Sequence, residues 1–355
     1  MVVEPESLCW LTGRMVPARD GVTWAEEFAR YPALKAVIRD DGTGLGKGLK
    51  LERAGRHAAG QPGLDDTLDV FHTLREGGRA LRATWAAAGR ALEAAGAAQR
   101  CCDQRGRQGV SNSGHGVSLN RLWAAAEHAL ARAEAAEAAW HRVRAALELF
   151  TPQGHLNDRR LAKAAVAAAV PDLAGTAWAK VRRLLGRRES FTFLDQAADR
   201  LAALGLDQDT LAALLDLEGL RRQPWRSRSS TPAAAATRTW ALVRTLQLEK
   251  TSPEWRGWAK QVGGVLRGVW RASSLVECVN SVARMQQSRH RKMTQGLLDL
   301  KRLYWNLRQF RTGPRKGQAP YGLLGLKLPE LSFWEFLKLA PEELREQLSA
   351  LEDTP

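Results

Sequence analysis

Short apolar segments bounded by turn residues open the chain and predict strands. Residues 7–12 (SLCWLT) and 35–39 (KAVIR) have this pattern, and a third apolar run covers residues 68–71 (LDVF). Between the first two, the string TWAE has the spacing of a capping box and predicts a helix over residues 23–31. The order strand, helix, strand, strand favours an α/β sheet at the start of the chain.

The pattern changes at residue 73, where apolar residues and alanines begin to recur at helical spacing. Two series of such positions flank a Gly/Ser/Asn-rich break at residues 105–118: Leu74, Leu81, Trp85, Ala88, Leu92 and Ala95, then Leu122, Ala126, Ala129, Ala133, Ala136, Trp140, Val143 and Leu147. The second series alternates steps of four and three, which is the repeat of packed α-helices. Two such helices predict an antiparallel helical hairpin over residues 73–150. A coiled coil that dimerises the chain is the alternative interpretation.

Shorter helices and one linker follow the hairpin. Helical periodicity continues to residue 250, for example over residues 159–169. The best linker candidate in the chain interrupts it at residues 223–232, QPWRSRSSTP. Further helices are expected after Thr251 and after Ala272. The charged residues near the C-terminus are mostly acidic, and the pattern there predicts two capped helices. The expected fold class is therefore α+β, and mostly α.

Composition places the chain among globular proteins. It has 355 residues, 45% hydrophobic and 26% charged, which excludes a wholly disordered chain. No stretch approaches the roughly 20 uninterrupted apolar residues of a membrane span, and the N-terminus lacks the pattern of a secretory signal. The four cysteines have no spacing typical of disulfide pairs or zinc ligands. We therefore expect a reduced, soluble protein of the cytoplasm.

Positive charge is concentrated in one segment. The chain has 53 Lys and Arg against 38 Asp and Glu, a net charge of +15. Residues 256–316 hold fourteen of the basic residues and only two acids, so this segment carries most of the excess. Aromatic residues interleave these charges, which favours nucleic acid as the partner. The alternative is a solvated basic helix face.

The densest glycine cluster, DDGTGLGKG at residues 40–48, does not match a nucleotide-binding loop. A phosphate-binding loop would need glycine in place of Asp41 and a hydroxyl residue in place of Gly48, and the glycine spacing of a dinucleotide site is also absent. What remains is a strand that ends in an acid and a flexible turn. Asp40 is either a metal ligand, fixed by the strand and left accessible by the loop, or a turn acid that binds nearby backbone.

Two further residues are candidates for chemistry. A helix would place Glu277, one of the two acids of the basic segment, on one face with Asn280 and Arg284, so it is either a site carboxylate or the partner of Arg284 in a salt bridge. His72 ends the third predicted strand and is either a ligand or base, or a structural histidine. The sequence has no Ser/His/Asp arrangement that favours a nucleophilic hydrolase.

Three strings from both ends of the chain carry a further signal. They are TWAEEFARYPALKAVIRDDGTGLGKGL, LDVFHTLREGGRAL and, the most specific, SSLVECVNSVARMQQSRHRKMTQGLLDLKRLYWNLRQFRTGPRKGQAPYGLLG. Together they resemble insertion-sequence transposases of the DDE type. The resemblance implies a ribonuclease-H-like core interrupted by a long helical insertion. Residues 1–72 and 251–325 would form the core, residues 73–250 the insertion, and residues 326–355 an acidic helical tail.

The resemblance also implies a site for phosphodiester chemistry. In transposases of this type three carboxylates hold two Mg²⁺ ions, which activate water or a DNA 3′-hydroxyl for attack. By resemblance, Asp40 is the second acid, with Asp41 a less favoured neighbour, and Glu277 is the third, so Asp40 and Glu277 are expected to be catalytic and to bind Mg²⁺. The expected DNA-binding residues are Arg284, Arg289, His290, Arg291, Lys292, Lys301, Arg302, Arg308, Arg311, Arg315 and Lys316.

A counterpart of the first acid is missing from the sequence. In the family it lies on the opening strand of the core, whereas MVVEPES at the start of this chain resembles the end of the following strand. The resemblance therefore implies an N-terminally truncated transposase without the first Asp and its central strand. We expect an incomplete Mg²⁺ site, weak or absent strand transfer, and unpaired backbone groups on the flanking strands.

Two other functions stay open on the sequence alone. A non-catalytic DNA-binding or regulatory protein would also use the basic segment and the hairpin, and a helical scaffold unrelated to DNA would use only the helical middle. The expected partners are DNA and either a second copy of the chain or full-length transposase, with no membrane. The expected location is the nucleoid in the cytoplasm.

Overall fold

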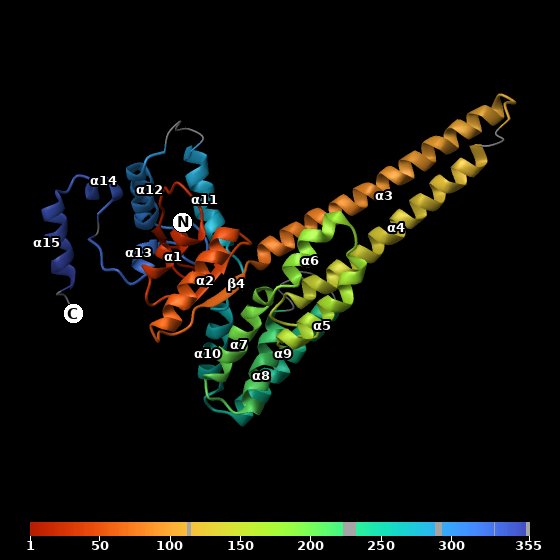
Figure 1. Cartoon of the computed structure of the whole chain (residues 1–355). Helices are drawn as coiled ribbons and strands as arrows, with labels where there is room; N and C mark the ends of the chain where they lie inside the picture. The colour runs from red at the N-terminus through yellow and green to blue at the C-terminus, as the bar shows by residue number, and fades with distance from the viewer. Residues whose placement is uncertain (112–114, 223–231, 288–292, 330, 353–355) are drawn as a thin grey trace. The chain divides into compact units, whose positions relative to one another are not determined.

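The structure is a computed structural model that describes residues 1–111, 115–222, 232–287, 293–329 and 331–352 (Figure 1). The chain divides into two compact units: unit 1 comprises Met1–Lys35, Gly42–Gly63 and Ala272–Pro355, and unit 2 comprises Ala36–Asp41 and Leu64–Arg271. Both are mostly helical, and the described residues add four short strands, so the expected α+β, mostly α class is confirmed. None of the described helices combines the length and hydrophobicity that a membrane crossing requires.

The four strands form two separate two-stranded sheets. In unit 1, β1 (Val2–Val3) pairs antiparallel with β2 (Trp10–Thr12). In unit 2, β3 (Ala36–Arg39) pairs parallel with β4 (Asp65–Leu68). The first two predicted strands are therefore found, as β2 and β3.

The strand predicted over residues 68–71 is wrong, because a helix cap lies in the middle of it. β4 ends at Leu68, and the side chain of Asp69 accepts a hydrogen bond from the backbone N–H of His72 to open α3 (Val70–Arg107). A capping carboxylate satisfies one of the N–H groups that have no partner inside a helix. A short apolar run does not by itself distinguish a buried strand from the first turn of a helix.

The first helix of unit 1 begins earlier than the sequence predicts. α1 covers Gly21–Ala29, and its cap is Asp20, which accepts from the N–H of Thr23 at 2.9 Å. The capping box predicted to start at Thr23 is therefore wrong. The same hydrogen bond holds the pKa of the Asp20 carboxyl below its usual range.

The glycine cluster predicted as a turn is instead the start of α2 (Thr43–Ala58). Its glycines let α1 and α2 pack closely. A Cβ added to Gly48 would lie 2.4 Å from the Cβ of Trp24 in α1, which is closer than any side chain tolerates. Helix contact, and not a flexible loop, explains the small residues.

Unit 2 contains a pair of long helices, α3 and α4 (His115–Ala146), which lie side by side in Figure 1. Alanines occupy the contact between them, and Ala95 and Ala126 are completely buried. Trp140 fits because it lies against Gly77, where an added Cβ would be 2.1 Å from the indole ring. The helical spacing of the sequence therefore corresponds to two real helices with a small-residue seam.

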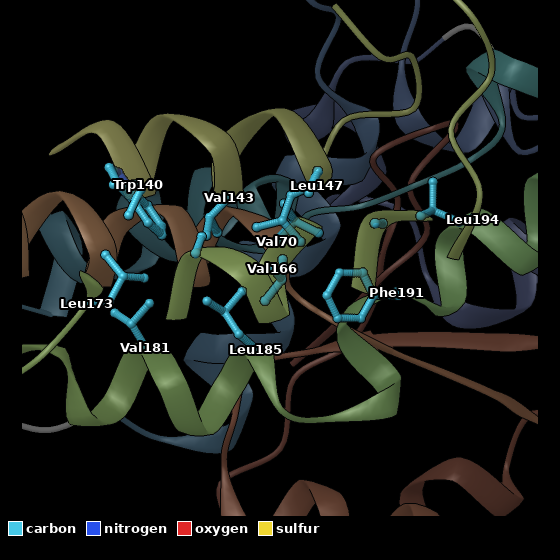
Figure 2. Packing of buried hydrophobic residues seen from close by; sticks show 14 of the residues in the cluster. Val70, Trp140, Val143, Leu147, Val166, Leu173, Val181, Leu185, Phe191 and Leu194 are labelled. Atoms are coloured by element: carbon cyan, nitrogen blue, oxygen red, sulfur yellow. The ribbon is translucent and has the colours of Figure 1, made fainter. Parts of the chain in front are cut away.

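Shorter helices complete unit 2. They are α5 (Arg159–Ala169), α6 (Ala179–Leu185), α7 (Thr192–Ala202), α8 (Gln208–Arg222), α9 (Pro232–Thr251), α10 (Trp255–Arg267) and the 3₁₀ helices η1 (Val170–Asp172), η2 (Thr176–Trp178) and η3 (Arg188–Ser190). Figure 2 shows the main core, where Val143 of α4 and Leu147, the residue after that helix, meet Val166, Val181 and Phe191. Each large apolar side chain buried there contributes about 1.5–3 kcal/mol. Residues 223–231 of the predicted linker lie outside the described residues.

The C-terminal segment returns to unit 1. It contains α11 (Ser274–Gln287), α12 (Gln295–Leu307), α13 (Pro320–Leu323), α14 (Phe333–Phe336) and α15 (Pro341–Glu352). The two capped helices predicted near the C-terminus are found as α14 and α15. Ser332 and Glu335 form the capping box of α14.

Side chains of α12 bind the backbone of β2 and the residues that flank it. Asn306 is completely buried, and its amide accepts from the N–H of Trp10 at 2.8 Å and donates to the Trp10 carbonyl at 3.0 Å. Trp305, Arg302 and Gln295 donate to the carbonyls of Leu8, Leu11 and Gly13, each at 2.9 Å. Side chains of α12 therefore pair the backbone N–H and carbonyl groups on this edge of β2, which in a larger sheet would pair with a neighbouring strand.

Candidate active site and nucleic-acid interface

The two parallel strands of unit 2 end side by side and place two acids at one edge. Arg39 is opposite Leu68, and the N–H of Asp69 donates to the Arg39 carbonyl at 2.8 Å, so the ladder continues to the strand ends. Neighbouring strands are about 4.8 Å apart, which makes the backbones of Asp40 and Asp69 neighbours. Asp40 is exposed. Ligand-binding side chains often lie at the carboxyl ends of parallel strands.

A buried ion pair between the strands fixes this edge. The Arg39 guanidinium donates through Nε and Nη2 to the two carboxylate oxygens of Asp66, at 2.9 and 2.7 Å. Their side chains are only 5% and 8% exposed. Arg39 Nη1 also donates to the carbonyl of Asp40 at 3.2 Å. A two-pronged contact of this kind holds the backbone at Asp40 in a defined position.

Asp41, the neighbour of Asp40, is engaged by two arginines. Its carboxylate lies 2.5 Å from Nη2 of Arg183 in α6 and 2.8 Å from Nη1 of Arg187. Two guanidinium groups compensate its negative charge and would compete with a metal ion for its oxygens. Of the two adjacent acids, Asp40 is the more accessible one.

Asp69 and His72 form a hydrogen-bonded pair at the same edge. The Asp69 carboxylate is completely buried, and its Oδ2 lies 2.6 Å from Nδ1 of His72, whose side chain is 26% exposed. A neutral ring that shares its Nδ1 proton with Asp69 has its lone pair on Nε2. The pair thus caps α3 and also orients the histidine, so the structural and the chemical interpretations of His72 are compatible.

Glu277, the other predicted site acid, belongs to unit 1. It lies in the first turn of α11 and is half-buried. A carboxylate is favourable there because the N-terminal end of a helix carries partial positive charge. On the same helix, Val279 is completely buried against Trp10 and Trp305. Asp40 belongs to unit 2, so the two predicted acids lie in different units.

The chemistry of Asp40 fits a magnesium ligand. Mg²⁺ prefers carboxylate oxygens, and commonly takes one or two from the protein and the rest from water and phosphates. Within the described part of the chain, no group of three His, Cys, Asp or Glu side chains is close enough to hold a metal ion. Asp40 therefore fits as one oxygen ligand among others.

Three of the predicted DNA-binding arginines make contacts inside unit 1. Arg302 donates to a carbonyl of β2, and Arg315 donates to two carbonyls between β1 and β2 at 2.8 and 3.1 Å. The guanidinium of Arg308 lies 3.9 Å from the centre of the Trp305 ring, a cation–π contact. Each of these arginines therefore has a structural role, whatever its contact with DNA.

Two other predicted residues, Arg311 and Lys316, are exposed on a short loop after α12. We call residues 310–318 the basic loop. Backbone hydrogen bonds close it: the N–H of Gly317 donates to the Phe310 carbonyl at 2.9 Å, and the N–H of Phe310 donates to the Gln318 carbonyl at 3.0 Å. A closed loop presents both cations to solvent at a defined place.

Of the other predicted DNA-binding residues, two lie in described helices and four lie outside the described residues. Arg284 lies in α11, and Lys301 lies in α12, where burial lowers the pKa of its ammonium group below the ordinary value. Arg289, His290, Arg291 and Lys292 lie outside the described residues.

Sequence reasoning missed Asp69, Arg183 and Arg187 as parts of this edge. Asp69 was assigned to a strand, although Asp before a helical pattern is a typical cap and could have been recognised. Arg183 lies 142 positions from its partner Asp41, and no local pattern announces such a contact.

Comparison with models of known protein families, with curated proteins and with solved structures finds no significant match to this chain.

Proposed function

We propose that this chain is a DNA-transposition protein of the DDE-transposase type that acts at the nucleoid, a catalytically impaired copy whose residual activity is metal-dependent phosphodiester chemistry. The observation that carries the proposal is the place of Asp40, which is exposed at the carboxyl end of β3, where the parallel partner strand leads into Asp69 and its hydrogen-bonded partner His72. The cations of the basic loop give the same protein a surface suited to DNA phosphates. In this proposal a ribonuclease-H-like core contains both β3 and α11.

Each residue of the proposed site would have a different role. Asp40 would contribute a carboxylate to Mg²⁺, which supplies charge stabilisation to a phosphodiester under attack, and Glu277 of α11 is the further acid that the resemblance implies. His72, held through Nδ1 by Asp69, is oriented to accept a proton at Nε2. Arg311 and Lys316 would neutralise backbone phosphates and position the duplex.

A nicking assay tests the catalytic part. The full chain is incubated with Mg²⁺ and a supercoiled plasmid that carries the DNA flanking its gene, and conversion to the nicked form is followed. Asp40→Asn should reduce the rate on the order of 100-fold, as expected when one charged group is lost from a catalytic site. Asp41→Asn is the matched control, because this acid is already compensated by two arginines. A greater loss in Asp41→Asn than in Asp40→Asn would refute the assignment.

The same assay separates the two DNA-related functions. If the wild-type chain binds the plasmid DNA but does not nick it with Mg²⁺, the protein is a DNA-binding or regulatory protein and not a catalyst. If it neither binds nor nicks DNA, the helical-scaffold interpretation is favoured.

A further inference from the structure

The C-terminal end of α10 in unit 2 gathers arginines that come from separate parts of the sequence. α10 packs against both α7 and α8 (Figure 1). Arg200 lies in the last turn of α7, Arg222 ends α8, and Arg267 ends α10, with Arg271 shortly after it. We call these four residues the arginine cluster.

Aromatic rings hold two members of the arginine cluster. The guanidinium of Arg222 lies 5.1 Å from the centre of the Phe150 ring, and that of Arg271 lies 5.8 Å from the centre of the Phe193 ring. A cation–π contact restricts the side chain without using the N–H donors of the guanidinium. Both arginines are partly exposed, so their positions are defined while solvent still reaches them.

The other two members are exposed. Arg200 donates through Nη1 to the carbonyl of Gly268, the cap of α10, at 2.9 Å, which uses one of its five N–H groups. Among the residues that the structure describes, neither Arg200 nor Arg267 forms an ion pair, and Asp199, which precedes Arg200 in α7, forms none either. These two guanidinium groups therefore keep donors for an external anion.

The acids that contact the arginine cluster are shared or engaged. Glu218 lies 3.6 Å from Arg222 and 3.8 Å from the neighbouring Arg221, and Glu148 pairs with Arg271 at 2.9 Å. Even with Asp199 included, these residues comprise five guanidinium groups and three carboxylates. Positive charge is thus in excess at this end of unit 2.

The cations of the arginine cluster also repel one another. Burial is the main cause that lowers the pKa of Arg222 below its ordinary value, Glu218 opposes the shift, and repulsion from Arg271 and Arg267 adds to it. The C-terminal end of a helix favours a nearby arginine, which explains each position separately. It does not remove the repulsion between arginines from different helices, whereas a bound anion would.

We infer that the arginine cluster is a contact site for the phosphate groups of a DNA backbone, in addition to the basic loop of unit 1. Guanidinium groups donate in pairs to phosphate oxygens and stay charged at neutral pH. Phosphates recur along a DNA strand, so several exposed guanidinium groups can each meet one without an enclosed pocket. The inference rests on the proposed function, because it adds a surface of unit 2 that holds the DNA.

The salt dependence of duplex binding by the full chain tests the inference. Arg200→Gln together with Arg267→Gln removes the two members that have no carboxylate partner within the described residues, so neither change deprives an acid of its ion pair. Fluorescence anisotropy should show weaker binding and a slope of log affinity against log salt concentration reduced by about 2. Arg90→Gln together with Arg100→Gln, at exposed positions of α3, is the charge-matched control and should keep the wild-type slope.

Two further variants keep the test decisive. Arg200→Lys together with Arg267→Lys should retain most of the slope, because the charge is kept. Arg267→Gln alone should reduce the slope by about 1. This single variant leaves the hydrogen bond from Arg200 to Gly268 intact, so it replaces the double variant if thermal melting shows that the double variant does not fold.

Each contrary result has a distinct meaning. An unchanged slope in folded Arg200→Gln/Arg267→Gln and in Arg267→Gln overturns the DNA contact, and Mg²⁺-dependent nicking by the wild-type chain would leave the proposed function standing. An equal reduction in the charge-matched control also overturns it, because the effect is then one of net charge. Failure of the wild-type chain to bind the duplex overturns both proposals.

A free polyphosphate is the other source of the same chemical group. Sodium triphosphate is added to the wild-type chain and to Arg267→Gln, and the thermal midpoint of each is measured. A rise in the wild type that is lost in Arg267→Gln, with an unchanged duplex slope, would assign the arginine cluster to a free polyphosphate and overturn the DNA contact.

Discussion

At the scale of single residues, long-range polar contacts define unit 1. The backbone of Trp10 is paired by the side chain of Asn306, which lies 296 positions away and is completely buried. A buried amide that satisfies both an N–H and a carbonyl prevents two unpaired polar groups inside the protein. An isolated asparagine in the sequence gives no indication of this role.

Asn306→Ala should destabilise the strand that it holds. The substitution leaves the N–H and the carbonyl of Trp10 without this partner, which costs about 2–5 kcal/mol. Hydrogen–deuterium exchange of the peptide containing β2 should therefore accelerate strongly. Gln309→Ala, at an exposed position just after α12, is the control and should stay within about 0.5 kcal/mol of the wild type. Equal exchange in both variants would contradict the role of Asn306.

Cys9 should resist alkylation in the folded protein. It is 1% exposed, and burial, with a smaller effect of Glu4, raises the pKa of its thiol to about 11. Only the thiolate reacts, so at pH 8 the folded chain presents almost none of it at this position. Mass spectrometry after treatment with N-ethylmaleimide should find Cys101 and Cys278, which are exposed, modified first. Modification of Cys9 before denaturant is added would show that this prediction is wrong.

At the scale of elements, spacing decided which segments are helices, and packing decided their ends. α5 has the bounds predicted from periodicity alone, because its apolar positions repeat at 3.6 residues. α2 was missed, because four glycines among its sixteen residues weaken the helical pattern. Contact with α1 overrides that weak propensity.

Two glycines of α2 should respond to the same substitution with opposite signs. Gly48→Ala forces a Cβ against Trp24 and should lower the thermal midpoint, since overpacking costs about 1–3 kcal/mol. Gly55→Ala meets nothing within 4 Å and should raise it, by roughly the 0.8–1.0 kcal/mol difference in helix propensity. Differential scanning calorimetry of the two variants is the measurement. Stabilisation by both would mean that α1 and α2 do not pack as described.

At the scale of the whole molecule, the charge of the chain should make its DNA affinity depend on salt. Each phosphate contact contributes about 0.9 to the slope of log affinity against log salt concentration. Changing Arg311 and Lys316 together to Gln should reduce that slope by about 2, because both are exposed on the basic loop. Fluorescence anisotropy with a duplex probe over a range of salt concentrations measures it.

A charge-matched variant separates local contact from net charge. Arg90 and Arg100 are exposed on α3 in unit 2, and changing both to Gln removes the same charge. Its slope should stay close to that of the wild type. If the two double variants change the slope equally, the basic loop has no special role and the effect is one of net charge.

Much of the helical architecture was determined by the sequence itself. Apolar and alanine spacing specified α3, α4 and α5, and Ser332 with Glu335 specified the start of α14, because helix formation and capping depend on residues a few positions apart. The basic segment was equally visible as composition. These features require no knowledge of distant contacts.

Only the tertiary structure decided which polar residues stay accessible. Asp40 and Asp41 are adjacent acids in the sequence, yet Asp40 is exposed, whereas the carboxylate of Asp41 is largely buried and pairs with Arg183 and Arg187. Arginines that look alike in the basic segment likewise differ, since Arg315 binds backbone carbonyls while Arg311 is exposed. The reason is physical: these contacts join residues more than a hundred positions apart, and folding alone brings them within hydrogen-bonding distance.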